Sequence, residues 1–182
     1  DTIVPPAITN AHNAVAGEGH ILVNLGLVHT DGRVFEYWRS LLDAMASIRP
    51  LYSWYVWDKL FPVPGDTRGR LAICHEWIFH FAKAPRSLNK TKECKHAGKY
   101  HSNSGQRTKE GDVKGWWGLD TPCQDTKVPG SVIRTASVLS NTERTGHPAQ
   151  YSLLFVAELI EPVTNVGESV YDPFLGSGTT LI

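Results

Sequence analysis

Residues 20–27 read HILVNLGL, a continuous apolar run of the length of one strand. A run that is apolar at successive positions is typical of a strand buried on both faces of a sheet. After a Thr-Asp-Gly turn, residues 34–48 carry apolar side chains at helical spacing. Residues 51–57, LYSWYVW, predict a second strand. Strand, helix and strand in this order indicate an α/β protein.

The rest of the chain continues this alternation with one long interruption. Residues 71–82 are an aromatic-rich third strand segment, and residues 132–139 are a weaker strand candidate. Residues 150–160 predict a helix, residues 169–174 (SVYDPF) a last strand, and residues 7–16 a short helix before the first strand. We therefore expect an α/β fold with a mostly parallel sheet flanked by helices.

Length and composition exclude several classes of protein. The 182 residues suit one domain with or without an insertion, and no apolar run approaches the roughly 20 residues of a membrane helix. The chain opens without the pattern of a secretory leader. Three cysteines at irregular spacing favour a reducing compartment over a disulfide framework. We expect a cytoplasmic protein without a membrane partner.

The charges are unevenly distributed, although basic and acidic residues number 18 each. Residues 83–114 hold nine basic and three acidic residues, a net charge of +6, so the other 150 residues carry −6. No apolar periodicity is sustained from residue 83 to residue 127, which suits either a solvated loop or a surface that faces phosphates. On the second interpretation, the candidate DNA-binding side chains are Lys90, Lys92, Lys95, Lys99, Arg107 and Lys109.

Residues 172–180, DPFLGSGTT, place two glycines directly after the last predicted strand. A strand that leads into glycines and a helix presents backbone N–H groups to a ligand. Gly176 and Gly178 permit a close approach, and Thr179 or Thr180 can cap the helix. The Walker lysine and the third glycine of the dinucleotide motif are missing, so we expect neither of those phosphate sites.

This nine-residue string resembles the cofactor motif of S-adenosylmethionine-dependent DNA amino-methyltransferases. Residues 145–149 (TGHPA) resemble the segment before that motif in the circularly permuted β class, and HILVNLG, YVWDK and HEWIFHF resemble strands of its catalytic half. The resemblance implies a Rossmann-like methyltransferase fold. In it, residues 1–82 would be the catalytic half, residues 83–131 a basic target-recognition insert, and residues 132–182 the start of the cofactor-binding half.

The resemblance also implies an activity. Such an enzyme moves a methyl group from S-adenosylmethionine to the exocyclic amino group of adenine (N6) or cytosine (N4), in a base flipped out of double-stranded DNA. It needs no metal, is encoded by a prokaryote or a phage, often for restriction-modification, and is a monomer or a homodimer. The implied cofactor-binding residues are Asp172, Pro173, Phe174, Gly176, Ser177, Gly178, Thr179 and Thr180, with His147 and Pro148 alongside.

Two departures from the family pattern concern catalysis. The family's catalytic motif is a polar residue, Pro-Pro and an aromatic residue, whereas Pro5 and Pro6 stand between Val4 and Ala7. If any part of the catalytic loop is present, these two prolines are its remnant. The sequence ends at Ile182, before the family's ribose-binding strand, so we expect a whole enzyme to need more chain. The alternative is a non-catalytic DNA-binding module of methyltransferase-like fold with a degenerate catalytic loop.

Other interpretations explain less of the sequence. Cys94, His96, His101 and Cys123 contain zinc-ligand chemistry, but their spacing matches no zinc-finger pattern. Cys74 lies in an apolar segment and is expected to be a packed thiol instead of a nucleophile. A methyltransferase that acts on RNA would share the glycine motif, but it accounts less well for the order of the β-class segments.

Overall fold

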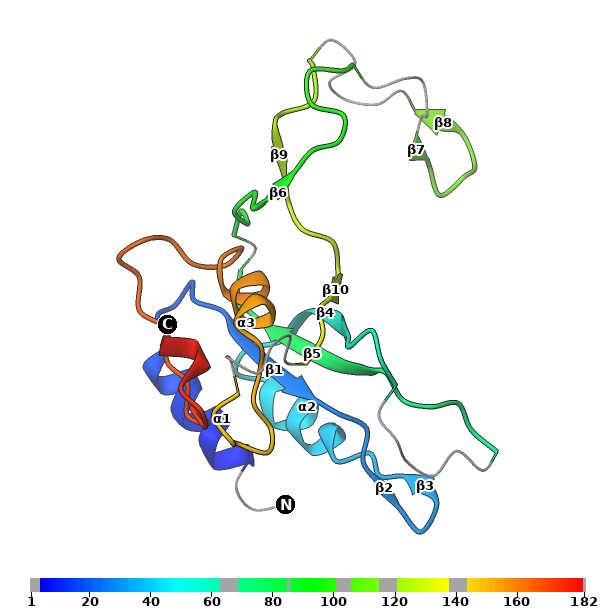
Figure 1. Cartoon of the computed structure of the whole chain (residues 1–182). Coiled ribbons are helices and arrows are strands. Elements are labelled where there is room, and N and C mark those ends of the chain that lie inside the picture. Colours follow the sequence, from blue (N-terminus) through cyan, green and yellow to red (C-terminus); the bar gives the residue numbers. More distant parts are fainter. Residues whose placement is uncertain are drawn as a thin grey trace. The chain divides into compact units, whose positions relative to one another are not determined.

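The computed structural model of this chain forms two compact units (Figure 1). The larger unit contains residues 1–87 and 130–182, and the smaller unit contains residues 88–129, in which most of the basic segment lies. The structure describes residues 4–62, 69–84, 86–100, 106–114, 121–137 and 144–181.

A mixed sheet of four strands is the centre of the larger unit. Its order is β1 (Ile21–Leu25), β5 (His75–Phe81), β4 (Leu51–Asp58) and β10 (Val132–Arg134). β5 is antiparallel to both of its neighbours, whereas β10 is parallel to β4. β1, β4 and β10 therefore run in one direction, and the reversed β5 lies between β1 and β4.

This topology corrects the expected mostly parallel sheet, since two of the three pairings are antiparallel. Apolar runs report burial on both faces of a strand but not its direction. A helix, α2 (Trp38–Ala46), lies between β1 and β4 in the chain and provides the crossover that lets them run the same way. No helix is described between β4 and β5, and a strand that returns through a loop can pair antiparallel.

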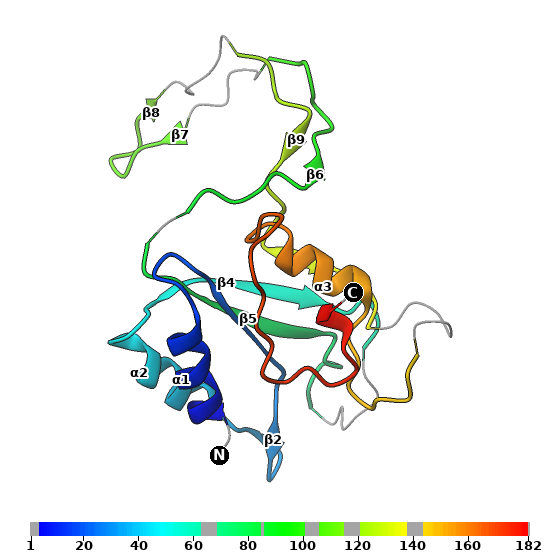
Figure 2. The same cartoon turned by 90° about the vertical axis from the view of Figure 1, so that its left-hand side faces the viewer.

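Helices cover both faces of the sheet (Figure 2). α1 (Val4–Ala14) and α2 pack on one face, where Ile8, Leu41 and Met45 join Phe79 in one buried cluster. α3 (Leu153–Ile160) packs on the other face. α2 and α3 are thus confirmed with shorter bounds than predicted, whereas α1 begins and ends earlier than the predicted residues 7–16. β1 contributes side chains to the clusters on both faces, which explains its continuous apolar run.

The second buried cluster positions α3. Phe155 of α3 stacks on Trp57 of β4 with ring centroids 4.0 Å apart, and Ile78 and Ile133 complete the cluster. Ser152 caps α3, because its Oγ accepts a hydrogen bond from the Phe155 N–H at 3.3 Å and donates one to the Ala136 carbonyl at 3.1 Å. This cap fixes the start of α3 beside the end of β10.

The predicted strand at residues 169–174 is not formed. These residues are all described, and none belongs to a strand or pairs with one. Val170 and Tyr171 are 47% and 55% exposed, so the segment runs over the surface. An apolar alternation becomes a strand only where a neighbouring strand offers hydrogen bonds, and no described strand lies beside this one.

The remaining elements are short. β2 (His29–Thr30) and β3 (Arg33–Val34) form a hairpin in the larger unit, which ends in the 3₁₀-helix η1 (Thr179–Leu181). In the smaller unit, β6 (Lys92–Glu93) pairs with β9 (Thr126–Lys127), and β7 (Gln106–Arg107) pairs with β8 (Val113–Lys114). None of the helices in the described part of the chain has the length and apolar character needed to cross a membrane.

Candidate functional site

The glycine turn, residues 172–180, is held in a conformation that requires glycine. Gly176 and Gly178 have φ angles of +54° and +80°, in the left-handed region that side chains with a Cβ rarely adopt. The Gly178 N–H donates to the Leu175 carbonyl at 2.8 Å. An added Cβ at Gly178 would meet no atom within 4 Å, so the backbone at this point is open to a ligand.

Side chains of the glycine turn brace it from within. The Asp172 carboxylate accepts from the Phe174 N–H at 2.9 Å through Oδ1 and from the Thr180 hydroxyl at 2.7 Å through Oδ2. The buried Thr179 hydroxyl donates to the Tyr151 carbonyl at 3.3 Å. The two threonine hydroxyls therefore hold the shape of the turn, and the open backbone is left for ligand contact.

Tyr151 joins the glycine turn to the sheet. Its hydroxyl donates to Asn24 Oδ1 at 2.9 Å, and the Asn24 amide donates to the Trp77 carbonyl at 3.1 Å. Burial, together with the nearby carboxylates of Glu76 and Asp172, raises the pKa of Tyr151 to about 12. The hydroxyl therefore keeps its proton and remains a donor. No sequence pattern indicates this role, because the partner Asn24 is 127 positions away.

The His-Pro segment lies against the glycine turn, so the structure brings together two of the segments that the sequence singled out. An added Cβ at Gly176 would lie 3.3 Å from the His147 ring atoms Cε1 and Nε2. The other ring nitrogen, Nδ1, accepts from the Ala149 N–H at 3.2 Å, which fixes the ring. Thr145 donates to the Gln150 side chain through its N–H at 2.9 Å and its hydroxyl at 3.1 Å.

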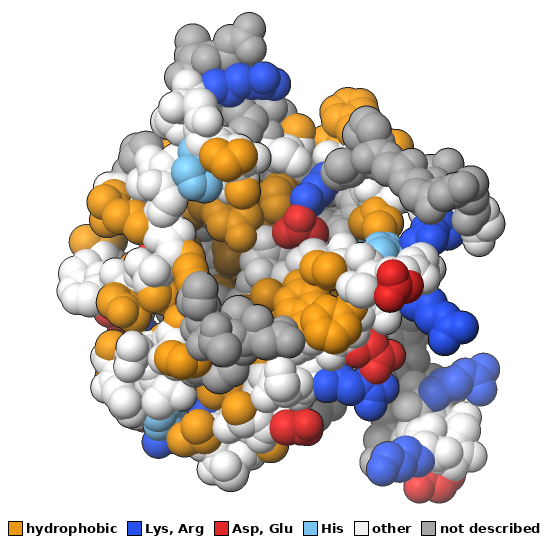
Figure 3. Space-filling view, turned by 90° about the horizontal axis from the view of Figure 1, so that it is seen from below, with side chains coloured by type: hydrophobic (Ala, Val, Ile, Leu, Met, Phe, Trp, Pro, Cys, Tyr) orange, Lys and Arg blue, Asp and Glu red, His pale blue; other side chains and the backbone are white. Residues whose placement is uncertain are grey.

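A pocket of about 620 Å³ adjoins this arrangement at the carboxyl ends of β4 and β10. That end of parallel strands is where α/β proteins bind ligands. The volume is in the usual range of small-molecule sites, about 300–1,000 Å³. Seen from below, hydrophobic side chains gather in and around a hollow of the surface (Figure 3). The pocket is lined by Lys59, Phe61, Ala136, Ser137, Arg144, Gly146, His147, Pro148 and Gln150.

The two cations of the pocket differ in their surroundings. Lys59 forms an ion pair with Glu76, and its Nζ lies 4.9 Å from the ring centroid of Trp57. Arg144 has no ion pair or hydrogen bond within the part of the chain that the structure describes. None of the described residues that line the pocket is a carboxylate, so no described group of the pocket compensates the charge of Arg144. The pocket is therefore suited to an anionic group.

Pro5 and Pro6 lie in the first turn of α1, not in a loop that follows a strand. Proline favours this position because the first helical residues have no N–H partner within the helix, and its φ angle is already helical. Helix geometry alone is therefore enough to account for the Pro-Pro pair. Its assignment as the remnant of a catalytic loop stays a prediction, and the structure adds that both prolines are helical.

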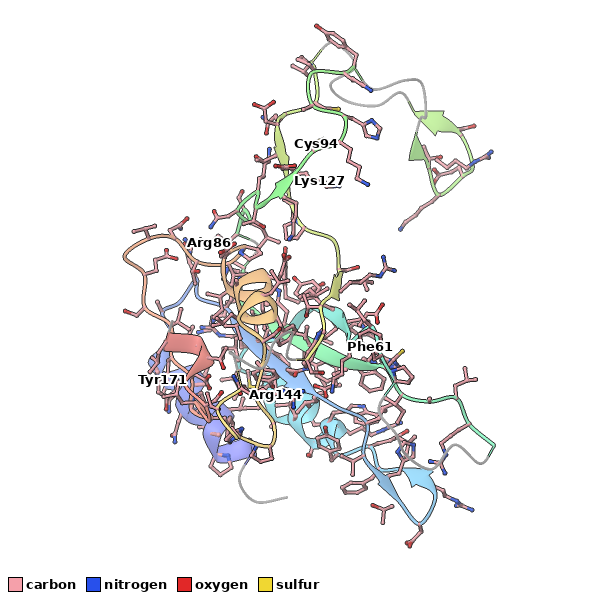
Figure 4. All side chains as sticks on the ribbon, in the orientation of Figure 1. Phe61, Arg86, Cys94, Lys127, Arg144 and Tyr171 are labelled. Carbon is pink, nitrogen blue, oxygen red and sulfur yellow. The ribbon has the colours of Figure 1, made fainter. Side chains whose placement is uncertain are left out.

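The predicted DNA-binding residues all lie in the smaller unit. Lys95, Lys99 and Lys109 are exposed, Lys92 lies half-buried in β6, and Arg107 donates to the Gly111 carbonyl at 3.4 Å. Lys90 donates to the Gln124 side chain. Three of the six predicted cations, Lys95, Lys99 and Lys109, are thus accessible to phosphates. Figure 4 shows the side chains of this unit, with Cys94 and Lys127 labelled.

The zinc alternative gains no geometric support. Cys94 and Cys123 flank a backbone turn in which Gly98 donates to the Cys123 carbonyl and Cys123 to the Lys99 carbonyl, both at 2.9 Å. Among the described residues, no three His, Cys, Asp or Glu side chains are grouped as a metal site would require. His101 lies outside the described residues.

Comparison with known proteins identifies relatives of this arrangement. The family model described as DNA methylase (N6_N4_Mtase) matches residues 3–182. The crystal structure of the M1.HpyAVI–SAM complex superposes with a TM-score of 0.60 over 97% of this chain and 68% of that chain, at 18% sequence identity. This likeness shows a shared fold. No curated protein matches the chain.

Proposed function

The chain belongs to the DNA methylase family, and from this premise we propose that it transfers a methyl group from S-adenosylmethionine to the exocyclic amino group of adenine or cytosine in DNA. One observation carries the proposal. The glycine turn and the His-Pro segment meet beside the 620 Å³ pocket at the carboxyl end of the sheet, where a cofactor and a base can lie next to each other. The SAM complex of the M1.HpyAVI structure supports the choice of cofactor.

The glycine turn would hold the cofactor mainly through its backbone. The hydroxyl protons of Thr179 and Thr180 are already donated within the turn, so neither is free to donate to a cofactor carboxylate. The backbone at Gly178 is open to approach, although its own N–H is donated to the Leu175 carbonyl, and Phe174 is 59% exposed. Asp172, Ser177 and Thr179 would then act by fixing the turn, while Phe174 offers an apolar surface. Pro173, His147 and Pro148 would border the cofactor.

The chemistry explains why positioning is the enzyme's main contribution. The lone pair of an exocyclic amino nitrogen is delocalised into the ring of the base, and S-adenosylmethionine supplies an activated methyl group to it. The target nitrogen is inaccessible inside a duplex, so the base must leave the stack, which costs a few kcal/mol. Residues of this chain would bind and orient both reactants, and alignment alone lowers the barrier substantially.

The basic smaller unit would hold the duplex. Residues 88–129 hold eight basic and five acidic residues, a net charge of +3, whereas the rest of the chain carries −3. Contacts of lysine and arginine with phosphates supply affinity without specifying sequence. A non-catalytic DNA-binding module is the second candidate. Its support is the helical placement of Pro5 and Pro6, which leaves no polar–Pro–Pro–aromatic loop at this point of the chain.

Methyl transfer tests the proposal. The protein is incubated with S-adenosylmethionine tritiated on its methyl group and with double-stranded DNA of mixed sequence. We expect label in N6-methyladenine or N4-methylcytosine after hydrolysis of the DNA. Bound but unlabelled DNA would instead establish the non-catalytic module, and RNA as the only labelled acceptor would contradict both.

A further inference from the structure

We propose that Phe61 and Arg144 form a binding site for one extrahelical nucleotide in the 620 Å³ pocket, with Phe61 stacking on the base and Arg144 pairing with an adjacent phosphate. The inference rests on the proposed function, since it names how this end of the sheet holds the DNA substrate.

The chain that leaves β4 is fixed so that Phe61 reaches the pocket. The Asp58 carboxylate accepts from the Leu60 N–H at 3.0 Å, and the Lys59 N–H donates to the Cys74 carbonyl at 2.8 Å. Leu60 itself has a φ of +67°, a left-handed conformation that is strained for a residue with a branched side chain. Such strain persists where the surroundings enforce it, and it concentrates at ligand sites.

Phe61 is the aromatic side chain of this region that lacks a ring partner. It is 72% exposed and has no ring contact within the described residues, although it borders the pocket. Trp57, four positions earlier, stacks on Phe155. A large apolar ring held at the mouth of a pocket offers a face on which a base can stack, as in proteins that bind single-stranded nucleic acid.

Arg144 supplies the matching charge. It lines the same pocket, it is exposed, and no described group neutralises it, whereas Lys59 is already paired with Glu76. Figure 4 labels Phe61 and Arg144 on the larger unit. An aromatic face and an uncompensated guanidinium together match a base and its phosphate. S-adenosylmethionine carries one carboxylate but also an ammonium and a sulfonium, so its net charge is positive. A nucleotide of DNA presents a phosphate without a compensating cation, and the unpaired Arg144 therefore favours DNA as the occupant.

Binding to two DNA duplexes distinguishes the contribution of this site from that of the basic smaller unit. One is fully paired, and the other has the same sequence with a single bulged adenine, which presents an extrahelical nucleotide without knowledge of the recognition sequence. Dissociation constants for both are measured by fluorescence anisotropy, because contacts to the paired duplex cancel in their ratio. We expect the protein to prefer the bulged duplex by about 5- to 150-fold, the range of one base–aromatic stacking contact.

Single substitutions test which residues cause the preference for the bulged duplex. Phe61→Ala should abolish it and Phe61→Tyr should keep it, with Leu71→Ala (91% exposed in the native chain, outside the pocket) as the matched apolar control. Arg144→Ala should reduce the preference and lower the salt dependence of bulge binding by about one phosphate contact, whereas Arg33→Ala should not. S-adenosylmethionine affinity should be the same in all variants.

Three results would overturn the inference: no preference for the bulged duplex, a preference that survives Phe61→Ala, or loss of S-adenosylmethionine binding in that variant, which would make the pocket part of the cofactor site. Failure of methyl transfer would contradict the proposed function, but it would leave the bulge preference as a separate result.

Discussion

The two ends of the central sheet use polar side chains in opposite ways. At the start of β1 and the end of β5, His20, His80 and Tyr55 contact one another: His20 Nδ1 lies 2.7 Å from His80 Nε2, and the Tyr55 hydroxyl lies 2.8 Å from His80 Nδ1. The buried His20 Nε2 has no hydrogen-bond partner among the described residues. At the other end, where β4 and β10 finish, Arg144 and Phe61 face a pocket without a described partner. Polar groups that are paired and buried stabilise a fold, whereas unpaired groups beside a pocket are available to a ligand.

Removal of Trp57 should have the largest effect, because both ends depend on the core between them. The ring is 2% exposed, stacks on Phe155, and its Nε1–H donates to Thr135 at 2.9 Å. We expect Trp57→Ala to lower the free energy of unfolding by about 3–5 kcal/mol. Chemical denaturation measures this, with the exposed Trp54→Ala as the matched variant. Equal losses in both variants would contradict the assigned core.

A fall in pH should act on the end of the sheet that contains His80 more than on the pocket end. Burial, together with the neighbouring His20, lowers the pKa of His80 to about 4. Below about pH 6.5, His80 is protonated in the unfolded chain but still neutral in the folded chain. The free energy of unfolding therefore decreases as the pH falls from about 6.5 through 4. The loss should reach about 3 kcal/mol at most.

Denaturation at pH 7 and pH 5 measures this effect. His80→Gln should flatten the dependence on pH, whereas His96→Gln, an exposed histidine of the smaller unit, should leave it as it is. An unchanged slope in His80→Gln would show that other groups cause the acid sensitivity.

Tyr151→Phe should have a smaller effect, centred on the pocket end. The variant leaves Asn24 Oδ1 without its donor, which typically costs about 1–3 kcal/mol for a buried group. Because Tyr151 also receives the Thr179 hydroxyl through its carbonyl, we expect weaker S-adenosylmethionine binding as the turn loosens. Tyr55→Phe, at the histidine end, is the control: it should lose stability without loss of cofactor affinity. An equal loss of S-adenosylmethionine affinity in Tyr151→Phe and Tyr55→Phe would contradict the difference between the two ends of the sheet.

The smallest effect is expected at an ion pair on the surface near the histidines. Arg86 donates to Glu168 at 2.6 Å, and this hydrogen bond, together with those from Asn165, lowers the pKa of Glu168 to about 2. Exposed pairs contribute little because water and salt screen them. Glu168→Gln should therefore leave the melting temperature and the cofactor affinity within error. A clear drop in either would mean that this pair supports the buried cluster.

Sequence patterns predicted the layers of the fold better than its connections. The apolar run at residues 20–27 correctly indicated a strand buried on both faces, and helical spacing located α2 and α3. Strand direction was missed, since it depends on the connections between strands. Residues 169–174 looked like a strand, but strand formation depends on a partner that local sequence does not reveal.

The candidate site was predictable where its residues are contiguous. The string DPFLGSGTT indicated the glycine turn through a family resemblance, and His147 was placed with it for the same reason. Tyr151, Phe61 and Arg144 were not found, because their roles arise from contacts between distant parts of the chain. An exposed phenylalanine or an unpaired arginine has no local signature, and only the fold shows what lies beside it.

Binding of S-adenosylmethionine to two glycine variants tests the central assignment most directly. Gly178→Val places a branched side chain at the open backbone of the glycine turn, where φ is +80°, and Gly167→Val imposes comparable backbone strain at φ +91° in a separate turn. In calorimetric titrations, we predict that the cofactor affinity falls at least about tenfold, or about 1.4 kcal/mol, for Gly178→Val and is unchanged for Gly167→Val. Wild-type affinity in Gly178→Val would contradict the account.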